Sequence, residues 1–166
     1  YKFATMLKDS PNIGSGEITV RGDPRVLRFG KFLRKTKLNE LPQLWNILIG
    51  DMSLVGPRPM VLGTYAYYPE KARKKLNTIR PGLTGIGSIV FRDEERYLAG
   101  LDEPMEFYRK EIIPYKSDLE LWFVQNNTLW TYTKVIFVTA WVVMFPSSNI
   151  VSKAFSGIPS LPETLI

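Results

Sequence analysis

Apolar and polar residues alternate along this chain in short blocks, most of which have the spacing of a helix. Between 26 and 33 the apolar residues fall on one side of a short helix, whose polar side carries Arg25, Arg28 and Arg34. Similar patterns predict helices at 40–49, 69–77, 104–113 and 117–126. A short strand is expected at 88–91.

Proline and glycine separate these blocks. The Pro-Arg-Pro at 57–59 must be an extended turn, because each proline fixes its own φ and restricts the residue before it. The segment 80–87 is a glycine-rich loop, Gly50 suits a helix end, and Asn39 can cap the helix at 40–49. We therefore expect an α/β or mainly α fold: a single compact domain of short helices with a small sheet and long Pro/Gly loops.

The most apolar segment is 129–145, in which Lys134 is the only charged residue. Its longest uncharged stretch is shorter than the roughly 17 residues that a membrane-spanning helix needs. Trp130 and Trp141 near its ends favour the headgroup boundary of a membrane. We expect this segment and 150–155 to lie on the membrane surface as interfacial helices, the alternative being a helix packed in the core. The tail from Pro146, rich in Ser and Pro, is expected to be irregular in backbone.

The composition narrows the chemistry. The 166 residues contain neither Cys nor His. This excludes disulfides, thiolate catalysis and Cys-based zinc sites, and it removes the usual general base. Catalysis must then use carboxylates, Lys, Arg, Tyr, hydroxyl groups or a metal held by oxygen. Phosphate chemistry with a hard cation such as Mg²⁺ fits that set.

The net charge of +6 is unevenly placed. Residues 1–80 carry 15 Lys/Arg against 6 Asp/Glu, and residues 81–166 carry 7 against 10. A basic half indicates an anionic partner, although a solvated basic surface is the alternative. No helix-turn-helix, zinc-finger or aromatic RNP pattern is present, so we expect no nucleic acid among the partners.

The stretch 34–59, RKTKLNELPQLWNILIGDMSLVGPRP, contains the candidate chemistry. It places Glu40 at a predicted helix start after Lys35 and Lys37, which would keep this carboxylate ionised. The rigid turn presents Arg58, whose planar guanidinium suits phosphate binding. A carboxylate and a fixed Arg, with a metal neutralising the diphosphate, are the minimum for phosphoryl transfer. On these residues alone, a first-turn acid and a surface Arg remain the commoner roles.

The same stretch resembles the core signature of the bacterial sugar transferases, the monotopic phosphoglycosyl transferases. The matching motifs are LNELPQ at 38–43, Asn46, GDMS at 50–53 and VGPRP at 55–59. Further matches lie at 1–3, 5–6, 23–25, 30–36 and 80–85, with looser ones at 113–116 and 119–121, whereas Ala4 stands where the family usually has Arg. So many ordered matches are far more specific than any lone motif.

This resemblance implies the transfer of a sugar 1-phosphate from a nucleotide diphosphate sugar, usually a UDP-sugar, to undecaprenyl phosphate. It implies Mg²⁺, a phosphosugar on the aspartate of an Asp-Glu pair, and a place on the cytoplasmic face of the bacterial inner membrane. It also implies a membrane anchor before Tyr1, a catalytic core at 1–126, and an interfacial or packing helix with a tail at 127–166. The sequence leaves open whether the chain forms a homo-oligomer.

The resemblance implies that Glu40 is the essential carboxylate and the Mg²⁺ ligand. We expect it to lie within about 10 Å of Arg58, a distance equal to the Debye length at 0.1 M salt. The side chains expected to bind substrate phosphates in one pocket are Arg58, Arg34 and Arg25, with Lys2 and Arg80 near its rim. The acidic cluster at 93–95 is expected either to help with Mg²⁺ or sugar hydroxyls or to be a solvated turn.

Asn39 departs from the family pattern, because it stands where the family has its aspartate nucleophile. A carboxamide oxygen is a poor nucleophile and carries no charge to hold Mg²⁺. Three interpretations are open: another route with Glu40 or the lipid phosphate attacking, an inactive variant, or a helix cap in a working subgroup. The main alternative to an enzyme is a catalytically silent scaffold that binds carrier lipid or nucleotide sugar.

Overall fold

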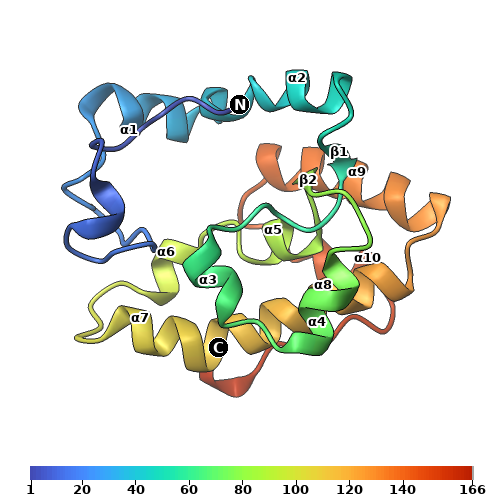
Figure 1. Cartoon of the computed structure of the whole chain (residues 1–166). Helices are drawn as coiled ribbons and strands as arrows, with labels where there is room; N and C mark the ends of the chain where they lie inside the picture. The colour runs from blue at the N-terminus through green and yellow to red at the C-terminus, as the bar shows by residue number, and fades with distance from the viewer. Residues whose placement is uncertain (166) are drawn as a thin grey trace.

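The computed structural model describes residues 1–165, which form short helices around a two-stranded sheet (Figure 1). The α-helices are α1 (Arg28–Lys35), α2 (Gln43–Leu48), α3 (Leu62–Ala66), α4 (Glu70–Leu76), α5 (Ile86–Val90), α6 (Glu94–Tyr97), α7 (Pro104–Phe107), α8 (Ile113–Gln125), α9 (Leu129–Met144) and α10 (Ile150–Ala154). Short 3-10 turns lie at Ser10–Asn12, Leu38–Glu40 and Glu163–Leu165, and a π-helical turn at Tyr108–Ile112 leads into α8. The predicted fold class is confirmed.

The small sheet determines where the Pro-Arg-Pro turn lies. Strands β1 (Ser53–Val55) and β2 (Gly82–Thr84) are parallel, with Ser53 opposite Gly82. A Cβ on Gly82 would lie 2.1 Å from the backbone nitrogen of Gly56, so only glycine allows the two strand ends to approach this closely. The turn that follows β1 is therefore held firmly against the loop around β2.

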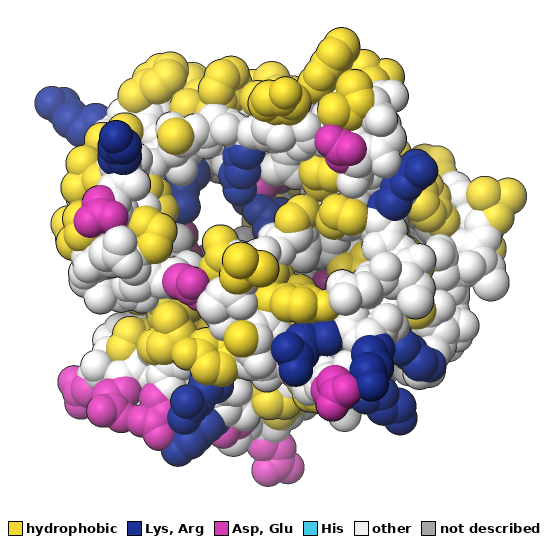
Figure 2. Space-filling model, in the orientation of Figure 1, with side chains coloured by type: hydrophobic (Ala, Val, Ile, Leu, Met, Phe, Trp, Pro, Cys, Tyr) yellow, Lys and Arg dark blue, Asp and Glu magenta, His cyan; other side chains and the backbone are white. Residues whose placement is uncertain are grey.

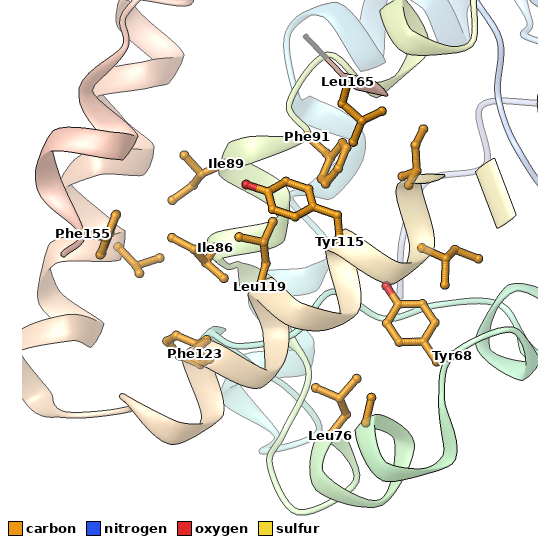
Figure 3. Packing of buried hydrophobic residues seen from close by; sticks show 14 of the residues in the cluster. Tyr68, Leu76, Ile86, Ile89, Phe91, Tyr115, Leu119, Phe123, Phe155 and Leu165 are labelled. Atoms are coloured by element: carbon orange, nitrogen blue, oxygen red, sulfur yellow. The ribbon is translucent and has the colours of Figure 1, made fainter. Parts of the chain in front are cut away.

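The hydrophobic core lies between α5, α8 and α9. Ile86 and Ile89 of α5 and Leu119 and Phe123 of α8 are nearly completely buried and point toward one another (Figure 3). Spacings of three and four residues place each pair on one face of its helix. Val135 of α9 is fully buried in the same cluster.

Helix α9 has one face in the core and another in contact with solvent. Val135, Val138 and Val142 are buried, whereas Trp130 is 69% exposed and Phe137 is 71% exposed. In the part of the chain that the structure describes, no helix combines the length and the apolarity needed to cross a membrane. The predicted helix at 129–145 is thus observed, and it packs in the core while keeping an exposed apolar side.

The tail differs from both predictions made for it. Residues 150–154 form α10, so this part is not irregular. Phe155 is 3% exposed and packs edge-on against Trp122, and Ile150 and Val151 also lie against the core. The prediction that 150–155 lies on a membrane surface is wrong, because the core already covers its apolar side.

Two other element predictions are wrong. The expected strand at 88–91 falls largely in α5, because the strand lies earlier in the glycine-rich loop and a helix buries Ile86 and Ile89 together. The expected helix at 40–49 is divided into a 3-10 turn and α2. Pro42 is the residue that precedes α2, so the α-helix itself begins only at Gln43.

Candidate active site

Glu40 and Arg58 are brought together by two different elements. Glu40 ends the 3-10 turn before α2, and Arg58 lies in the Pro-Arg-Pro turn after β1. The guanidinium of Arg58 donates a hydrogen bond of 2.7 Å to Oε1 of Glu40, and Nζ of Lys2 lies 3.8 Å from the same oxygen. The predicted proximity of Glu40 and Arg58 is confirmed.

The charges around Glu40 keep it ionised. Burial raises the pKa of this carboxyl, but Arg58, followed by Lys2 and Lys37, more than offsets burial and leaves the pKa below its ordinary value. Burial and the nearby Arg58 lower the pKa of Lys2, with Glu40 opposing them. The ionisation of Glu40 was predicted from a helix dipole and nearby cations, and the structure supplies the cations as Arg58, Lys2 and Lys37. Glu40 itself lies in a single 3-10 turn.

Asn39 lies beside this pair and is buried, with 5% of its surface exposed. Its backbone carbonyl accepts a hydrogen bond from the amide of Phe3. Its side-chain Oδ1 is buried and has no hydrogen-bond partner, and the side chain caps no helix. The capping role considered for Asn39 is therefore wrong, and an unpartnered polar atom lies at the family's nucleophile position.

Glu40 and Arg58 are on the wall of a cavity of about 1660 Å³. This volume exceeds the roughly 300–1,000 Å³ of ordinary small-molecule sites. Figure 2 shows a hollow on this face of the molecule with Lys and Arg side chains around it. The basic residues that line the cavity are Lys2, Arg34, Lys35, Lys37, Arg58, Arg92, Arg96 and Lys116. The lining also carries six acids, Glu17, Glu40, Asp93, Glu94, Glu95 and Glu120, so basic residues exceed acidic ones by only two. The part of the cavity around Arg58, Lys2 and Arg34 suits the phosphate charges of a ligand.

Arg34 and the acidic cluster at 93–95 meet across this cavity. Nε of Arg34 donates to Oγ1 of Thr5 at 3.1 Å, and its Nη1 lies 3.5 Å from Oε1 of Glu95. Glu94 pairs with Lys116 of α8. Burial raises the pKa of Glu95, with Arg34 opposing it. Glu94 and Glu95 are half-buried and paired, so the interpretation of this cluster as a solvated turn is wrong for these two residues.

Arg25 does not reach the cavity, and its predicted phosphate-binding role is wrong. It is 2% exposed and forms an ion pair of 2.6 Å with Asp23, whose pKa it lowers strongly. Its other donors bond to the loop at 10–18, to the carbonyls of Ser10, Ile13, Gly16 and Ile18 and to Oγ of Ser15. With all its N–H groups engaged, Arg25 organises the N-terminal loop and has no donor left for a substrate.

Arg80 is also outside the cavity lining. It is exposed, and its guanidinium lies near Gly50 at the end of α2. Of the five predicted phosphate ligands, the structure thus places Arg58, Arg34 and Lys2 around one cavity and leaves Arg25 and Arg80 away from it.

Comparison with known sequences identifies the family of this chain. The profile of the family described as bacterial sugar transferase matches residues 1–146. The chain belongs to the bacterial sugar transferase family. Among its relatives within that family is the undecaprenyl-phosphate galactose phosphotransferase of Salmonella typhimurium, with 34% identity over 158 residues, covering 87% of this chain and 30% of the relative.

Two more sugar transferase relatives are similarly close. The UDP-glucose:undecaprenyl-phosphate glucose-1-phosphate transferase of Caulobacter vibrioides is 38% identical, over 80% of this chain and 45% of its own length. The exopolysaccharide production protein PSS of Rhizobium leguminosarum is 35% identical, over 84% of this chain and 66% of its own length. This sugar transferase chain therefore spans less than half the length of the Salmonella and Caulobacter relatives.

Sequence reasoning missed the part of the sugar transferase cavity that α8 contributes. Lys116 and Glu120 both line the cavity. They lie in the looser family matches at 113–116 and 119–121, but no role in the site was predicted for them. They are four residues apart, and such residues share a helix face. The spacing of these two charged residues on one face of the helix was the signal that was available in the sequence.

Proposed function

We propose that this chain transfers a sugar 1-phosphate from a nucleotide diphosphate sugar, with UDP as the expected nucleotide, to undecaprenyl phosphate. The observation that carries the proposal is the Arg58–Glu40 pair, which lies at 2.7 Å on the wall of a large cavity in a chain of this family. The names of relatives, which act on undecaprenyl phosphate with galactose or glucose, support this choice of substrates. The reaction would be the first membrane step of surface polysaccharide or glycoconjugate synthesis.

The cavity residues have distinct roles in this reaction. An oxygen of the lipid phosphate forms a bond to the β-phosphorus of the donor, while the bond from that phosphorus to the bridging oxygen breaks. The nucleoside monophosphate leaves with the bridging oxygen. Arg58 exchanges Glu40 for phosphate oxygens, which its planar guanidinium binds through two parallel hydrogen bonds. Lys2 and Arg34 add positive charge where the phosphoryl oxygens gather.

Mg²⁺ fits the residues on this wall as a cation that arrives with the diphosphate. The carboxylate of Glu40 is a ligand of the kind that Mg²⁺ prefers, whereas the unpartnered oxygen of Asn39 beside it is uncharged. Within residues 1–165 there is no group of three or more side chains arranged to hold a metal. We propose that Glu40 holds Mg²⁺ together with substrate phosphates and water, and that the ion neutralises diphosphate charge when bound.

Replacing Asn39 with aspartate is expected to raise turnover by about tenfold or more. A carboxylate is a competent nucleophile toward phosphorus where an amide is not, so the change opens a covalent route beside direct attack by the lipid phosphate. The measurement is the rate of UMP release, together with mass spectrometry of the quenched protein for a phosphosugar adduct. An unchanged rate without an adduct would show that catalysis here does not use position 39 as the family does.

We also propose that the chain works on the cytoplasmic leaflet of the membrane, where its lipid acceptor lies. Helices α1 and α2 and the turn between them expose an apolar ridge, defined as Phe29, Phe32, Leu41, Leu44, Trp45 and Leu48. Figure 2 shows apolar side chains along this edge of the molecule, close to the hollow. Exposed contiguous apolar surface of this kind marks a membrane or protein contact.

The double substitution of Trp45 and Leu48 by serine is expected to reduce binding to phosphatidylglycerol-containing vesicles at least tenfold. The two side chains are 57% and 77% exposed, and burying one large apolar side chain contributes about 1.5–3 kcal/mol. Flotation of protein with vesicles measures this. Leu62→Ser is the matched control, because Leu62 is 86% exposed outside the ridge. Equal losses in both proteins would contradict a specific role for the ridge.

The transfer itself is tested by incubating the chain with UDP-galactose or UDP-glucose, Mg²⁺ and undecaprenyl phosphate. The proposal requires UMP release that depends on the lipid phosphate. Asn39 favours a second candidate, a silent scaffold that binds one of the substrates without turnover. Binding of UDP-sugar without any UMP release, in wild type and in Asn39→Asp alike, would support the scaffold.

A further inference from the structure

Glu120 of α8 is a buried acid that the reaction described above does not use. Its side chain lines the cavity, yet the residue is only 4% exposed, and Oε2 is buried with no hydrogen-bond partner. Gly87 of α5 leaves room for it, because a Cβ at that position would lie 2.4 Å from Oε1 of Glu120. Burying a carboxyl group without a partner is costly, so an acid in this position needs a reason.

The surroundings of Glu120 keep it largely uncharged. Burial raises its pKa to about 8, with Lys116 and the backbone amide of Arg58 opposing that rise. Lys116 is itself engaged by Glu94 and by the hydroxyl group of Tyr108, so it does not neutralise Glu120 as a dedicated partner. A neutral carboxyl group both donates and accepts hydrogen bonds.

A second polar group lies near Glu120 in the cavity without a partner. Oγ of Ser88, next to Gly87 in α5, is buried and forms no hydrogen bond, and Ser88 also lines the cavity. Tyr68 belongs to the same lining and is 3% exposed. Unpartnered hydroxyl and carboxyl groups beside an aromatic ring form an uncharged, hydrogen-bonding surface.

This surface adjoins the phosphate-binding end of the cavity through Arg58. The guanidinium of Arg58 bonds to Glu40, while its backbone amide faces the carboxyl group of Glu120. A phosphate held by the guanidinium therefore has the Glu120 surface as a near neighbour. In a nucleotide diphosphate sugar, the group attached directly to the transferred phosphate is the sugar.

We propose that Glu120 and Ser88 form the subsite that binds the sugar hydroxyl groups of the donor. This inference rests on the proposed function. Hydroxyl groups supply the partners that Oε2 of Glu120 and Oγ of Ser88 lack, whereas an uncharged surface offers no opposite charge to another phosphate. The nucleobase is separated from the transferred phosphate by a second phosphate and the ribose, so the sugar fits this position better than the base.

Substitution of Glu120 by glutamine and by leucine tests the subsite. Glutamine keeps an uncharged donor and acceptor of the same shape, so the KM for UDP-galactose or UDP-glucose should stay within about threefold. Leucine removes both, and we expect this KM to rise at least tenfold, because a site built for hydroxyl groups binds poorly when its hydrogen bonds are lost. Inhibition by UDP, which lacks the sugar, and the KM for undecaprenyl phosphate should not change.

Three further measurements keep the test decisive if Glu120→Leu does not fold. Gly87→Ala keeps the acid but displaces its carboxyl group, and should raise the same KM selectively. Asp118→Leu makes an equivalent change on an exposed position of α8 and should leave every constant unchanged. Calorimetric binding of UDP-sugar and UDP to the wild-type chain separates a failure of the subsite from a failure of the proposed function. No binding of either nucleotide would contradict the proposed function itself.

Two outcomes would overturn the subsite. One is an unchanged KM for both UDP-sugars in Glu120→Leu and in Gly87→Ala. The other is a loss of UDP inhibition as large as the loss of UDP-sugar binding, which would assign this surface to the nucleobase.

Discussion

Replacing Glu40 with glutamine is expected to reduce turnover by about 10²–10⁴-fold, the range for loss of a positioned acid or base. Glutamine has nearly the same shape but no negative charge, so it cannot hold Mg²⁺ or pair with Arg58 and Lys2 as the carboxylate does. The pKa of Glu40 lies below its ordinary value, so the wild-type group is fully ionised at neutral pH. UMP release at saturating UDP-sugar and undecaprenyl phosphate measures the effect.

Glu70→Gln is the matched control for this change. Glu70 is an exposed acid that pairs with Lys74 one turn further along α4. Such surface pairs contribute little, so its substitution should leave turnover unchanged. A Glu40→Gln protein with full activity would contradict the assignment of the site.

Arg58→Lys is expected to lower kcat/KM for the UDP-sugar by about 100-fold. Lysine keeps the positive charge, but its compact ammonium cannot form two parallel hydrogen bonds with a phosphate. Losing one preorganised donor to a developing phosphoryl charge costs about 10²–10³ in rate, and the prediction lies at the lower end because the charge remains. The Pro-Arg-Pro turn holds the backbone, so a lysine at this position cannot move closer to compensate.

Steady-state kinetics with varied UDP-sugar separates the effect of Arg58→Lys on kcat from its effect on KM. Arg28→Lys, an exposed position on α1, provides the control and should be neutral. If Arg58→Lys retained more than half of the wild-type kcat/KM, the guanidinium would be acting only as a point charge. That result would contradict the two-bond role given to Arg58.

The proximity of Glu40 and Arg58 was predicted from the stretch 34–59 that contains both, although they are 18 residues apart and meet through a tertiary contact. The prolines around Arg58 fix its turn, and the turn before α2 places Glu40 opposite it. The helix at 129–144 was predictable from local sequence, because a long apolar run follows Thr128, whose side chain caps it. Local sequence was sufficient where local geometry dominates.

The surroundings of a side chain in the folded protein account for what the sequence did not predict. The motif that contains Arg25 marks it as a basic residue, but only the folded loop shows that five carbonyl and hydroxyl oxygens and Asp23 occupy its donors. Glu120 was missed because its environment is formed by Gly87, Tyr68 and the turn at Arg58, all distant from it in the chain. Burial of a polar group is a tertiary property, which spacing along one helix only suggests.

The most direct test of the proposed reaction is to follow ³²P in the β-phosphate of UDP-galactose or UDP-glucose during incubation with the wild-type chain and undecaprenyl phosphate. The account predicts that the label enters the lipid extract with the sugar, and that the nucleotide product is unlabelled UMP. Label that remains in released UDP would show transfer of the sugar without its phosphate. That result, or no transfer of label with either donor, would contradict the proposal that this cavity catalyses sugar-phosphate transfer.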